Sequence, residues 1–404
     1  MPVRPTEREL DEFLTRAVSE VYDRAELRQA LATGERRLRV KQGFDPTRPN
    51  LHLGHVVCLR KLRTLAAWGH EIVIIIGDYT TQIGDPTDKD ETRPTMSHEE
   101  VLANAQTYLD QFHRIVPREN TRIVYQTEWY AGFGLKDVIH LAARFSAQQM
   151  LAREEFRKRI AAKTPIPIKD LLYPLLQAYD SVAIESDLEV GGTDQQFNVL
   201  AGRELQEKIG QRPQNVFIIE LLEGLDGEKM SKSKPATGIW LTDEPGEMFG
   251  KLMAIKDELM PQYFEWATEL PLDEVRATLA ALADGTLHPR DAKVKLARQV
   301  VTELHSAAAA EDAAAAFRTQ FAQGRQPAEI PTVHLTTDGA ASINIVDLLV
   351  RASLVQSRGE GRRLVEQRGV KVEGTVAELA TEVPVSTEPV LQYGKRKYAR
   401  ISWD

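Results

Sequence analysis

The sequence predicts an α/β protein in which a Rossmann-like, parallel-sheet domain is followed by an α-helical domain and a small α+β domain. Three observations predict this fold class. Short apolar runs alternate with helical patterns through the first part of the 404 residues. From about residue 244 the pattern turns helical, and the last block combines helix-like with strand-like segments. Strand–helix alternation is typical of βαβ units and therefore of a parallel sheet.

The first βαβ unit is the clearest. RLRVKQGF (37–44) and EIVIIIGD (71–78) are expected to be buried strands, because they are rich in Val and Ile and bounded by Gly or Asp. GHVVCLRKLRTLAAWG (54–69), between them, has helical periodicity and ends at a glycine. Further elements are expected as helices near 98–116, 135–160, 168–184 and 194–209 and as strands near 121–125, 186–190 and 215–219.

The remaining chain carries the other two domains. An Ala-rich helix is expected at 306–322, and the Pro, Gly and Thr content of QGRQPAEIPTVHLTTDGAA is typical of a linker. The expected boundaries are 1–230 for the parallel-sheet domain, 231–325 for a lysine-containing loop and the helical domain, 326–341 for the linker and 342–404 for the C-terminal domain.

Composition excludes several classes of protein. The formal net charge is −8, so any contact with RNA must depend on local basic patches. The single cysteine, Cys58, excludes an intrachain disulfide framework. The N-terminal MPVRPTERELDEFL has no apolar core, so no signal peptide is expected. With no long apolar run either, we expect a cytoplasmic protein that does not span a membrane.

The first motif that carries chemistry is GFDPTRPNLHLGH (43–55), where a strand is expected to end and a helix to begin. The spacing of His52 and His55 places both imidazoles on one face of the first turn. Free N–H groups and the dipole of a helix N-terminus favour an anion, so the site suits a triphosphate. Gly54 would let a nucleotide base approach the helix backbone. A metal-binding pair is the weaker alternative, because no third ligand is nearby.

The second motif is GEKMSKSKP (227–235), in which Lys229 and Lys232 alternate with small hydroxyl residues after the last expected strand. A basic loop of this kind is often only a solvated surface. Alternatively, its ammonium groups can close over a departing pyrophosphate and neutralise the charge that develops there. The chain contains neither a Walker A loop nor a dinucleotide-binding GxGxxG.

Together, HLGH and the later KMSKS form the double signature of class I aminoacyl-tRNA synthetases, and the chain resembles that class. YPLLQAYD (173–180), GGTDQQFN (191–198) and IGDPTDK (83–89) further resemble tyrosyl-tRNA synthetases, in that family's order and spacing. The last block resembles the small ribosomal-protein-type RNA-binding domain of bacterial members. The resemblance covers roughly residues 30 to 404 and implies a Rossmann-like catalytic domain.

The resemblance implies a tyrosine site on one helix. Tyr173, Gln177 and Asp180 are spaced by four and three residues, which independently places them on one helical face. By resemblance, Asp180 accepts a hydrogen bond from the phenolic hydroxyl, while Tyr173 and Gln177 hold the α-ammonium. The resemblance assigns five more residues to tyrosine and its adenylate: Asp45, Thr80, Asp85, Gln126 and Gln195.

ATP is implied as the second substrate, with Mg²⁺ expected on its phosphates and no metal site expected on the protein. His52, His55, Lys229 and Lys232 are expected to stabilise charge during the reaction. The full ATP-binding set implied by the resemblance is Gly43, His52, Gly54, His55, Gly192, Asp194, Lys229, Met230, Ser231, Lys232 and Ser233.

One residue departs from the family pattern. Many members have a tyrosine three residues before the phenylalanine of GFDPT, where it gives the substrate hydroxyl a second partner. In this chain that position is Lys41. Either another residue supplies the second contact, or Asp180 acts alone.

The implied macromolecular partners are tRNA and a second copy of the chain. Basic residues beside Tyr393 and Tyr398 suit phosphate contact combined with base stacking. The expected tRNA-binding residues are Arg358, Arg362, Arg363, Lys395 and Lys397. The family also implies a homodimer, with its interface expected at the helices near 130–165.

Three alternative functions stay open at the level of sequence. A tryptophan-specific synthetase would share the fold and both signatures, although Tyr173, Gln177 and Asp180 favour tyrosine. A catalytically silent RNA-binding paralogue could have lost the histidines and lysines, which this chain retains. A nucleotidyltransferase for a small substrate would not need the helical and C-terminal domains.

Overall fold

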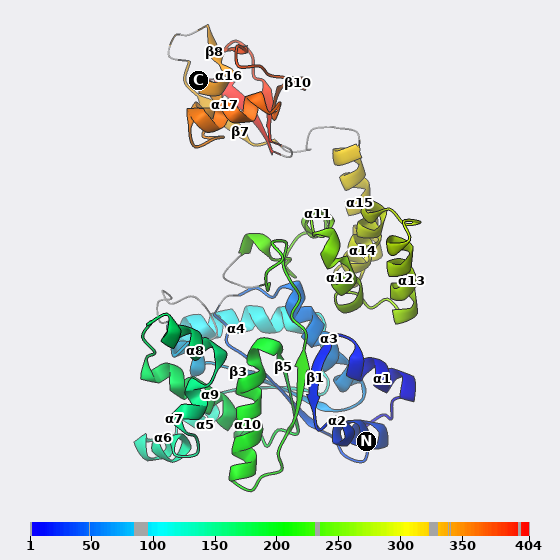
Figure 1. Cartoon of the computed structure of the whole chain (residues 1–404), viewed down its shortest axis with the longest axis vertical. Helices are drawn as coiled ribbons and strands as arrows, with labels where there is room; N and C mark the ends of the chain where they lie inside the picture. The colour runs from blue at the N-terminus through cyan, green and yellow to red at the C-terminus, as the bar shows by residue number, and fades with distance from the viewer. Residues whose placement is uncertain are drawn as a thin grey trace. The chain divides into compact units, whose positions relative to one another are not determined.

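The computed structural model describes residues 2–47, 49–84, 96–230, 235–322, 330–337, 339, 341–394 and 397–403. The chain divides into two compact units, Met1–Ala314 and Ala315–Asp404 (Figure 1). Within the described parts of the chain, every helix is too short or too polar to cross a membrane.

A six-stranded sheet forms the centre of the first unit, in the order β1-β6-β5-β2-β3-β4. Its strands are β1 (Val18–Tyr22), β2 (Arg39–Phe44), β3 (Glu71–Ile76), β4 (Thr121–Tyr125), β5 (Leu188–Gly192) and β6 (Asn215–Ile219). Strands β2 to β6 are parallel, and β1 pairs with β6 in the antiparallel direction at one edge. The predicted parallel-sheet fold class is therefore confirmed.

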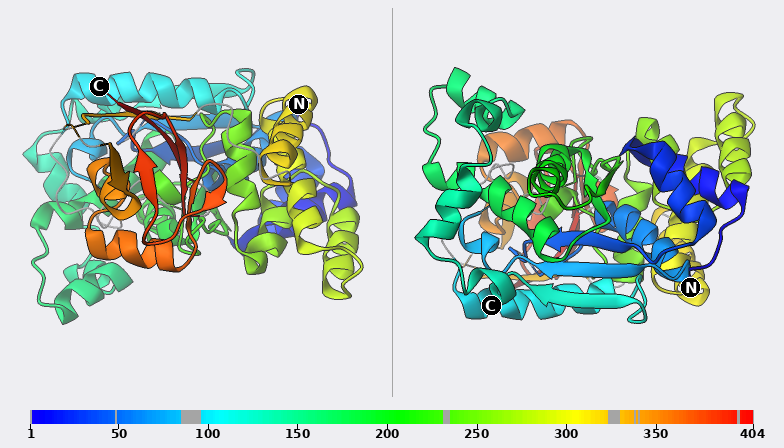
Figure 2. Two further views of the ribbon diagram at one scale, coloured as in Figure 1. Left: turned by 90° about the horizontal axis from the view of Figure 1, so that it is seen from above. Right: turned by 90° about the horizontal axis from the view of Figure 1, so that it is seen from below.

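Helices cover both faces of this sheet. The four that connect or flank its central strands are α3 (Leu53–Ala67), α4 (His98–Phe112), α9 (Ile168–Ala183) and α10 (Gln196–Lys208). Connections from β2 to β4 run in one direction along the sheet and the connection from β5 to β6 runs in the other, so right-handed crossovers place α4 and α10 on opposite faces. Figure 2 shows these two helices on either side of the strands.

The strand order reverses between β2 and β5, and these two strands separate early. They pair only at Val40↔Leu188 and Lys41↔Glu189, whereas β2 pairs with β3 over its whole length. Open α/β sheets bind ligands at the carboxyl ends of their strands, at such a reversal point. The topology therefore places the candidate site between the ends of β2 and β5.

The rest of the first unit is helical. It includes α1 (Glu7–Thr15) and α2 (Arg24–Thr33) before the sheet, and α11 (Pro245–Met253), α12 (Met260–Trp266), α13 (Leu272–Ala283), α14 (Pro289–Leu304) and the start of α15 (Ala307–Ala322) after it. Ion pairs join this part to the sheet domain, because Arg60 of α3 lies 2.5 Å from Glu303 of α14 and 3.3 Å from Glu269.

Two features of the first unit differ from the sequence prediction. The single helix expected at 135–160 is divided into α6 (Leu135–Ala142), α7 (Ala147–Leu151) and α8 (Glu154–Ala161). Ser146 caps α7 through the N–H of Gln149, and Arg153 is extended, so each stops the preceding helix. Strand β1 was not predicted, because its sequence, VSEVY, is only partly buried and lacks a continuous apolar run.

The second unit contains a five-stranded sheet in the order β10-β9-β12-β13-β7 and a two-stranded sheet of β11 and β8. Its strands are β7 (Thr332–Leu335), β8 (Ser342–Asn344), β9 (Val370–Val372), β10 (Thr375–Val376), β11 (Glu382–Pro384), β12 (Val390–Tyr393) and β13 (Lys397–Trp403). Helices α16 (Ile345–Arg351) and α17 (Arg358–Glu366) pack with these strands around their own apolar core.

Candidate active site

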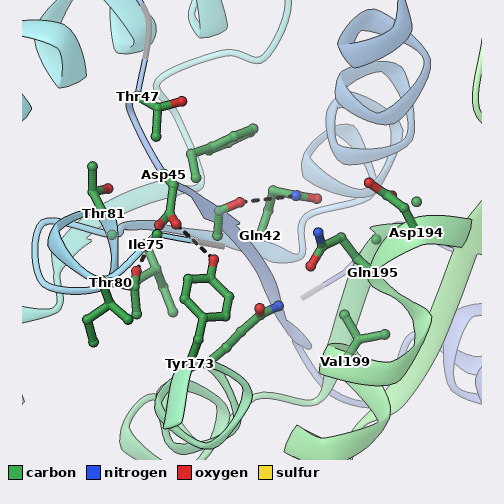
Figure 3. A pocket seen from close by; sticks show the side chains of 18 of the residues that line it. Gln42, Asp45, Thr47, Ile75, Thr80, Thr81, Tyr173, Asp194, Gln195 and Val199 are labelled. Atoms are coloured by element: carbon green, nitrogen blue, oxygen red, sulfur yellow. Dashed lines mark hydrogen bonds between the residues drawn. The ribbon is translucent and has the colours of Figure 1, made fainter. Parts of the chain in front are cut away.

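A cavity of about 640 Å³ opens where β2 and β5 separate. The ends of both strands, the first turn of α3 and one face of α9 line it. In Figure 3, Tyr173 points toward Asp45, and Gln195 faces the same space from the opposite side.

One end of the cavity holds a buried carboxylate. Asp180, on α9, is 2% exposed, and three neutral side chains of the β4–α5 segment surround it. Gln126 Nε2 donates to Asp180 Oδ2 at 2.7 Å, and Trp129 Nε1 donates to Oδ1 at 3.1 Å. The Tyr130 hydroxyl, whose main acceptor is a backbone carbonyl, lies 3.4 Å from the same Oδ1.

Burial dominates the electrostatics of this carboxylate. It raises the pKa of Asp180 to about 7, while the positive charge of Lys41 and the hydrogen bond from Gln126 act in the opposite direction. Burial therefore favours the neutral acid, and a ligand that donates a hydrogen bond to the carboxylate favours the anion.

A second group of polar side chains continues from this end toward the middle of the cavity. The Tyr173 hydroxyl donates to Asp45 Oδ2 at 2.8 Å, and the Thr80 hydroxyl lies 2.8 Å from Asp45 Oδ1. The backbone N–H of Thr80 donates to Gln126 Oε1 at 2.9 Å. Asp45, Thr80, Gln126 and Tyr173 thus form one connected network, and Gln177 lines the same cavity.

The imidazole pair lies at the other end. His52 precedes α3 as its N-cap and His55 is in the first turn, with ring centroids 3.8 Å apart. The backbone N–H of His52 donates to His55 Nδ1 at 3.1 Å. Trp240 meets the His52 ring edge-on at 5.6 Å, and the same two residues form a backbone β-bridge.

The segment before the lysine loop (residues 231–234) lines the cavity, and the segment after it contacts the first residue of α3. Before the loop, the Met230 N–H donates to Leu222 O at 3.1 Å, and Lys229 forms an ion pair with Asp194. After the loop, the backbone carbonyl of Ile239 accepts a hydrogen bond from the backbone N–H of Leu53 at 2.8 Å. Lys229, Met230, Asp194 and His52 all line the one cavity, so segments far apart in sequence share it. Ser231, Lys232 and Ser233 lie outside the described residues.

Two glycines of the cavity wall stand where a side chain would be crowded. A Cβ on Gly54 would lie 3.0 Å from His52 Nδ1, and one on Gly192 would lie 2.7 Å from both Asp194 Oδ1 and Leu221 Cδ2. Gly43, in contrast, has open space where a Cβ would be. Asp85, predicted to bind tyrosine, lies outside the described residues.

The predicted RNA-contacting residues lie in the second unit. Arg358, Arg362 and Arg363 are exposed on α17, and Arg358 lies 2.5 Å from Asp347. Lys397 is exposed at the start of β13, with its ammonium 5.8 Å from the centre of the Tyr393 ring. Lys395 lies outside the described residues.

Sequence reasoning missed several residues of the cavity wall. Trp129 and Tyr130 contact Asp180, and Trp240 contacts His52. Glu189, 2% exposed, pairs with Lys41 beneath the cavity. Opposite charges inside the apolar strands RLRVKQGF and SDLEVGG were a signal that could have indicated this pair.

Comparison with known proteins identifies the family. A sequence model described as "tRNA synthetases class I (W and Y)" matches residues 33–322, which is more than half of the chain. The chain belongs to this family. A second model, described as "S4 domain", matches residues 344–388 in the second unit.

Close relatives of this class I tRNA synthetase extend over nearly its whole length. A tyrosine–tRNA ligase from Dehalococcoides mccartyi is 46% identical over 396 residues, which cover 98% of each chain. One from Moorella thermoacetica is 45% identical and covers 96% of this chain and 94% of its own.

Solved structures share the fold. Tyrosyl-tRNA synthetase from Archaeoglobus fulgidus, complexed with L-tyrosine, superposes with a TM-score of 0.61 at 23% identity, covering 76% of this chain and 99% of that one. A truncated mitochondrial tyrosyl-tRNA synthetase from Aspergillus nidulans gives a TM-score of 0.61 at 21% identity, covering 77% of this chain and 94% of that one.

Proposed function

We propose that the chain is a tyrosine–tRNA ligase, which activates L-tyrosine with ATP and transfers it to the 3′ end of its tRNA. The observation that carries the proposal is the cavity between β2 and β5. It has a buried carboxylate, Asp180, at one end and an imidazole pair with Lys229 at the other. Relatives at 44 to 46% identity over almost the full length are tyrosine–tRNA ligases, which supports the same activity here.

Substrate tyrosine would lie with its phenol toward Asp180. Gln126 and Trp129 each donate to a different oxygen of this carboxylate and so fix its orientation. Its remaining lone pairs accept the phenolic O–H. Phenylalanine would leave that acceptor without a donor in a buried site, which costs about 1–3 kcal/mol or more for a charged group. Asp45, Tyr173 and Gln177 are placed to hold the α-ammonium.

In the first step an oxygen of the tyrosine carboxylate attacks the α-phosphorus of ATP. The bond from that phosphorus to the bridging oxygen breaks, which gives tyrosyl-adenylate and pyrophosphate. The carboxylate is already ionised, so no general base is required. His52, His55, Lys229 and Lys232 stabilise the charge that develops on the phosphates, and positioning supplies the rest of the acceleration. Gly192 and Asp194 lie where the ribose would bind.

In the second step a terminal ribose hydroxyl of tRNA attacks the acyl carbon of the adenylate, held near Gln195. The ester forms, AMP leaves, and the hydroxyl proton is released. Mg²⁺ bound to the ATP phosphates would neutralise part of their charge. The second unit would supply basic residues for contact with tRNA. The proposed location of the reaction is the cytoplasm.

The proposed quaternary state is a homodimer. Four large apolar side chains near the predicted interface are strongly exposed: Leu135 (76%), Ile139 (57%), Ile160 (53%) and Ile168 (73%). Leu135 and Ile139 are one turn apart on α6, and neighbouring exposed apolar side chains are typical of a protein interface.

Amino-acid-dependent exchange between pyrophosphate and ATP tests the proposed activity. Purified chain is assayed in parallel with tyrosine, tryptophan and phenylalanine at equal concentrations. We expect exchange with tyrosine at least about 100-fold above either analogue, because Asp180 needs a hydroxyl donor at the position that the tyrosine hydroxyl would occupy. Faster exchange with tryptophan would instead indicate the sister specificity, and no exchange with any amino acid would indicate a silent RNA-binding paralogue.

A further inference from the structure

A buried ion pair lies where β2 and β5 separate, and one of its members, Glu189, lines the cavity. Lys41 of β2 and Glu189 of β5 form the last cross-strand pair before the strands separate, and they are 0% and 2% exposed. Lys41 Nζ lies 2.9 Å from Glu189 Oε1. The next residues on each strand, Gln42 and Val190, line the cavity.

The ammonium of Lys41 also holds α9. Nζ donates to the backbone carbonyl of Gln177 at 2.9 Å and to the hydroxyl of Ser181 at 2.8 Å, so with Glu189 all three of its protons have acceptors. Ser181 in turn donates to Glu189 Oε2 at 3.1 Å, and Gln214 Nε2 donates to the same oxygen at 2.5 Å. The turn of α9 that carries Gln177 and Asp180 is therefore fixed to β2 and β5 through one buried cation.

This network also sets the electrostatics of Asp180. Lys41 is the main charge that favours the Asp180 anion, and Glu189 opposes it less strongly. From the remaining neighbouring element, α5 (Thr127–Tyr130), the neutral Tyr130 hydroxyl and the Trp129 indole face the carboxylate, with Gln126 just before them.

The ionised form of Asp180 is the better acceptor for a hydrogen bond from the phenolic O–H. Gln126 directs an N–H at one of its oxygens and Trp129 directs an N–H at the other. A proton on either oxygen would occupy a lone pair that otherwise remains for the phenolic O–H, and hydrogen bonds to a charged acceptor are stronger than those to a neutral one.

Stability alone does not account for the buried pair. Replacing a buried ion pair by apolar side chains of similar volume is often neutral or stabilising, because desolvation offsets the attraction between the charges. A pair fully buried directly under a ligand cavity, with bonds to two residues of the recognition helix, is instead what a binding role requires.

We infer that Lys41 is a positioning residue for tyrosine recognition. It fixes the Gln177–Ser181 turn and holds Asp180 as the anion that accepts a hydrogen bond from the phenolic O–H. The inference rests on the proposed function. It also gives the lysine at this position a role without any direct contact with the substrate hydroxyl.

Three variants test the inference by pyrophosphate exchange, each measured from pH 5.5 to 9 with tyrosine varied at saturating ATP and then with ATP varied. Lys41→Met removes the ammonium. Lys41→Met with Glu189→Gln removes both charges and keeps the volume, which guards against misfolding of the single variant. Lys61→Met is the matched control, because Lys61 is also a buried lysine (7% exposed), whereas its ammonium donates to Phe13 O of α1.

We expect Lys41→Met to lower kcat/KM for tyrosine at pH 7 by about tenfold or more, and to move the acidic limb of that profile upward by about one pH unit. The kcat/KM for ATP should change less than about twofold. Thermal unfolding should show lost stability in Lys41→Met and recovery in the double variant, because Glu189 no longer lies unpaired. The tyrosine defect should persist in the double variant, because Lys41 acts on Asp180 more strongly than Glu189 does.

If the double variant regained wild-type tyrosine kinetics together with its stability, Lys41 would be merely structural and the inference would be overturned. The same holds if Lys61→Met reproduced the full pattern. An inactive wild-type chain would contradict the proposed function, and the inference with it, whereas an active wild type with unaffected Lys41 variants would contradict the inference alone.

Discussion

Asp180, which we propose binds the substrate hydroxyl, is buried at a cost to the stability of the fold. Its side chain is buried among neutral donors, so burial raises its pKa to about 7 from an ordinary value near 4. Between these two pH values the folded chain binds a proton that the unfolded chain has released. Stability therefore falls as pH rises through this window, at up to about 1.4 kcal/mol per pH unit.

Asp180→Asn should remove this pH dependence. We expect the unfolding temperature of the variant, relative to wild type, to rise progressively between pH 4 and 7 and then to level off, because wild type alone must take up a proton on folding in this range. Tyrosine kcat/KM should fall at least about tenfold. Scanning calorimetry across pH 4 to 8 measures the first effect.

Asp284→Asn is the control for that experiment. Asp284 is exposed and accepts hydrogen bonds from Thr286, which lower its pKa. The difference in unfolding temperature between this variant and wild type should therefore not grow between pH 4 and 7. A constant offset for Asp180→Asn over the whole range would show that Asp180 does not titrate in the window given above.

Cavity residues could be predicted where the pattern lies within one short segment, and were missed where it depends on contacts between separate segments. The spacing of Tyr173, Gln177 and Asp180 along one helix already indicated a common face, and the structure places all three on the cavity wall. Trp129 and Tyr130 reach Asp180 from a separate segment, and no periodicity connects that segment to α9. Lys41 was recognised as unusual, but its partner Glu189 depends on strand register, which the sequence does not specify.

At the scale of elements, short Val- and Ile-rich runs were a good guide to the parallel strands. β2, β3, β4 and β6 lie where Val- and Ile-rich runs predicted them, and α3 begins at the histidine pair. The edge strand β1 and the division of residues 135–160 were missed, because the first is half exposed and the second depends on local caps. The helices of that region also leave apolar side chains on the surface.

The exposed face of α6 should be needed for dimer formation. Leu135→Glu combined with Ile139→Glu places two charges where we propose that a second copy buries two apolar side chains. We expect the 45.4 kDa chain to sediment as a dimer and the variant as a monomer at micromolar concentration. Ile209→Glu, at an apolar position 41% exposed beyond α10, should leave the wild-type dimer intact. A monomeric wild type would contradict the proposal.

At the scale of the whole molecule, we propose that the first unit forms the adenylate and that the second unit binds tRNA. Every described residue that lines the cavity belongs to the first unit, and the S4 match and the exposed arginines of α17 belong to the second. Adenylate formation involves only small molecules, whereas the transfer step needs tRNA. The two activities should therefore be separable by cutting between the units.

A chain that ends at residue 322, the end of α15, tests this separation. It avoids leaving β7 without its partner β13, and it retains the entire described cavity. We expect tyrosine-dependent pyrophosphate exchange within about threefold of the full chain, and a loss of tRNA charging of at least about 100-fold, because each phosphate contact that is lost weakens RNA binding. In the full chain, Arg362→Glu with Arg363→Glu should reproduce part of the charging defect and increase its sensitivity to salt. If the truncated chain lost exchange as well as charging, while remaining folded by circular dichroism, the second unit would be required for catalysis in the first.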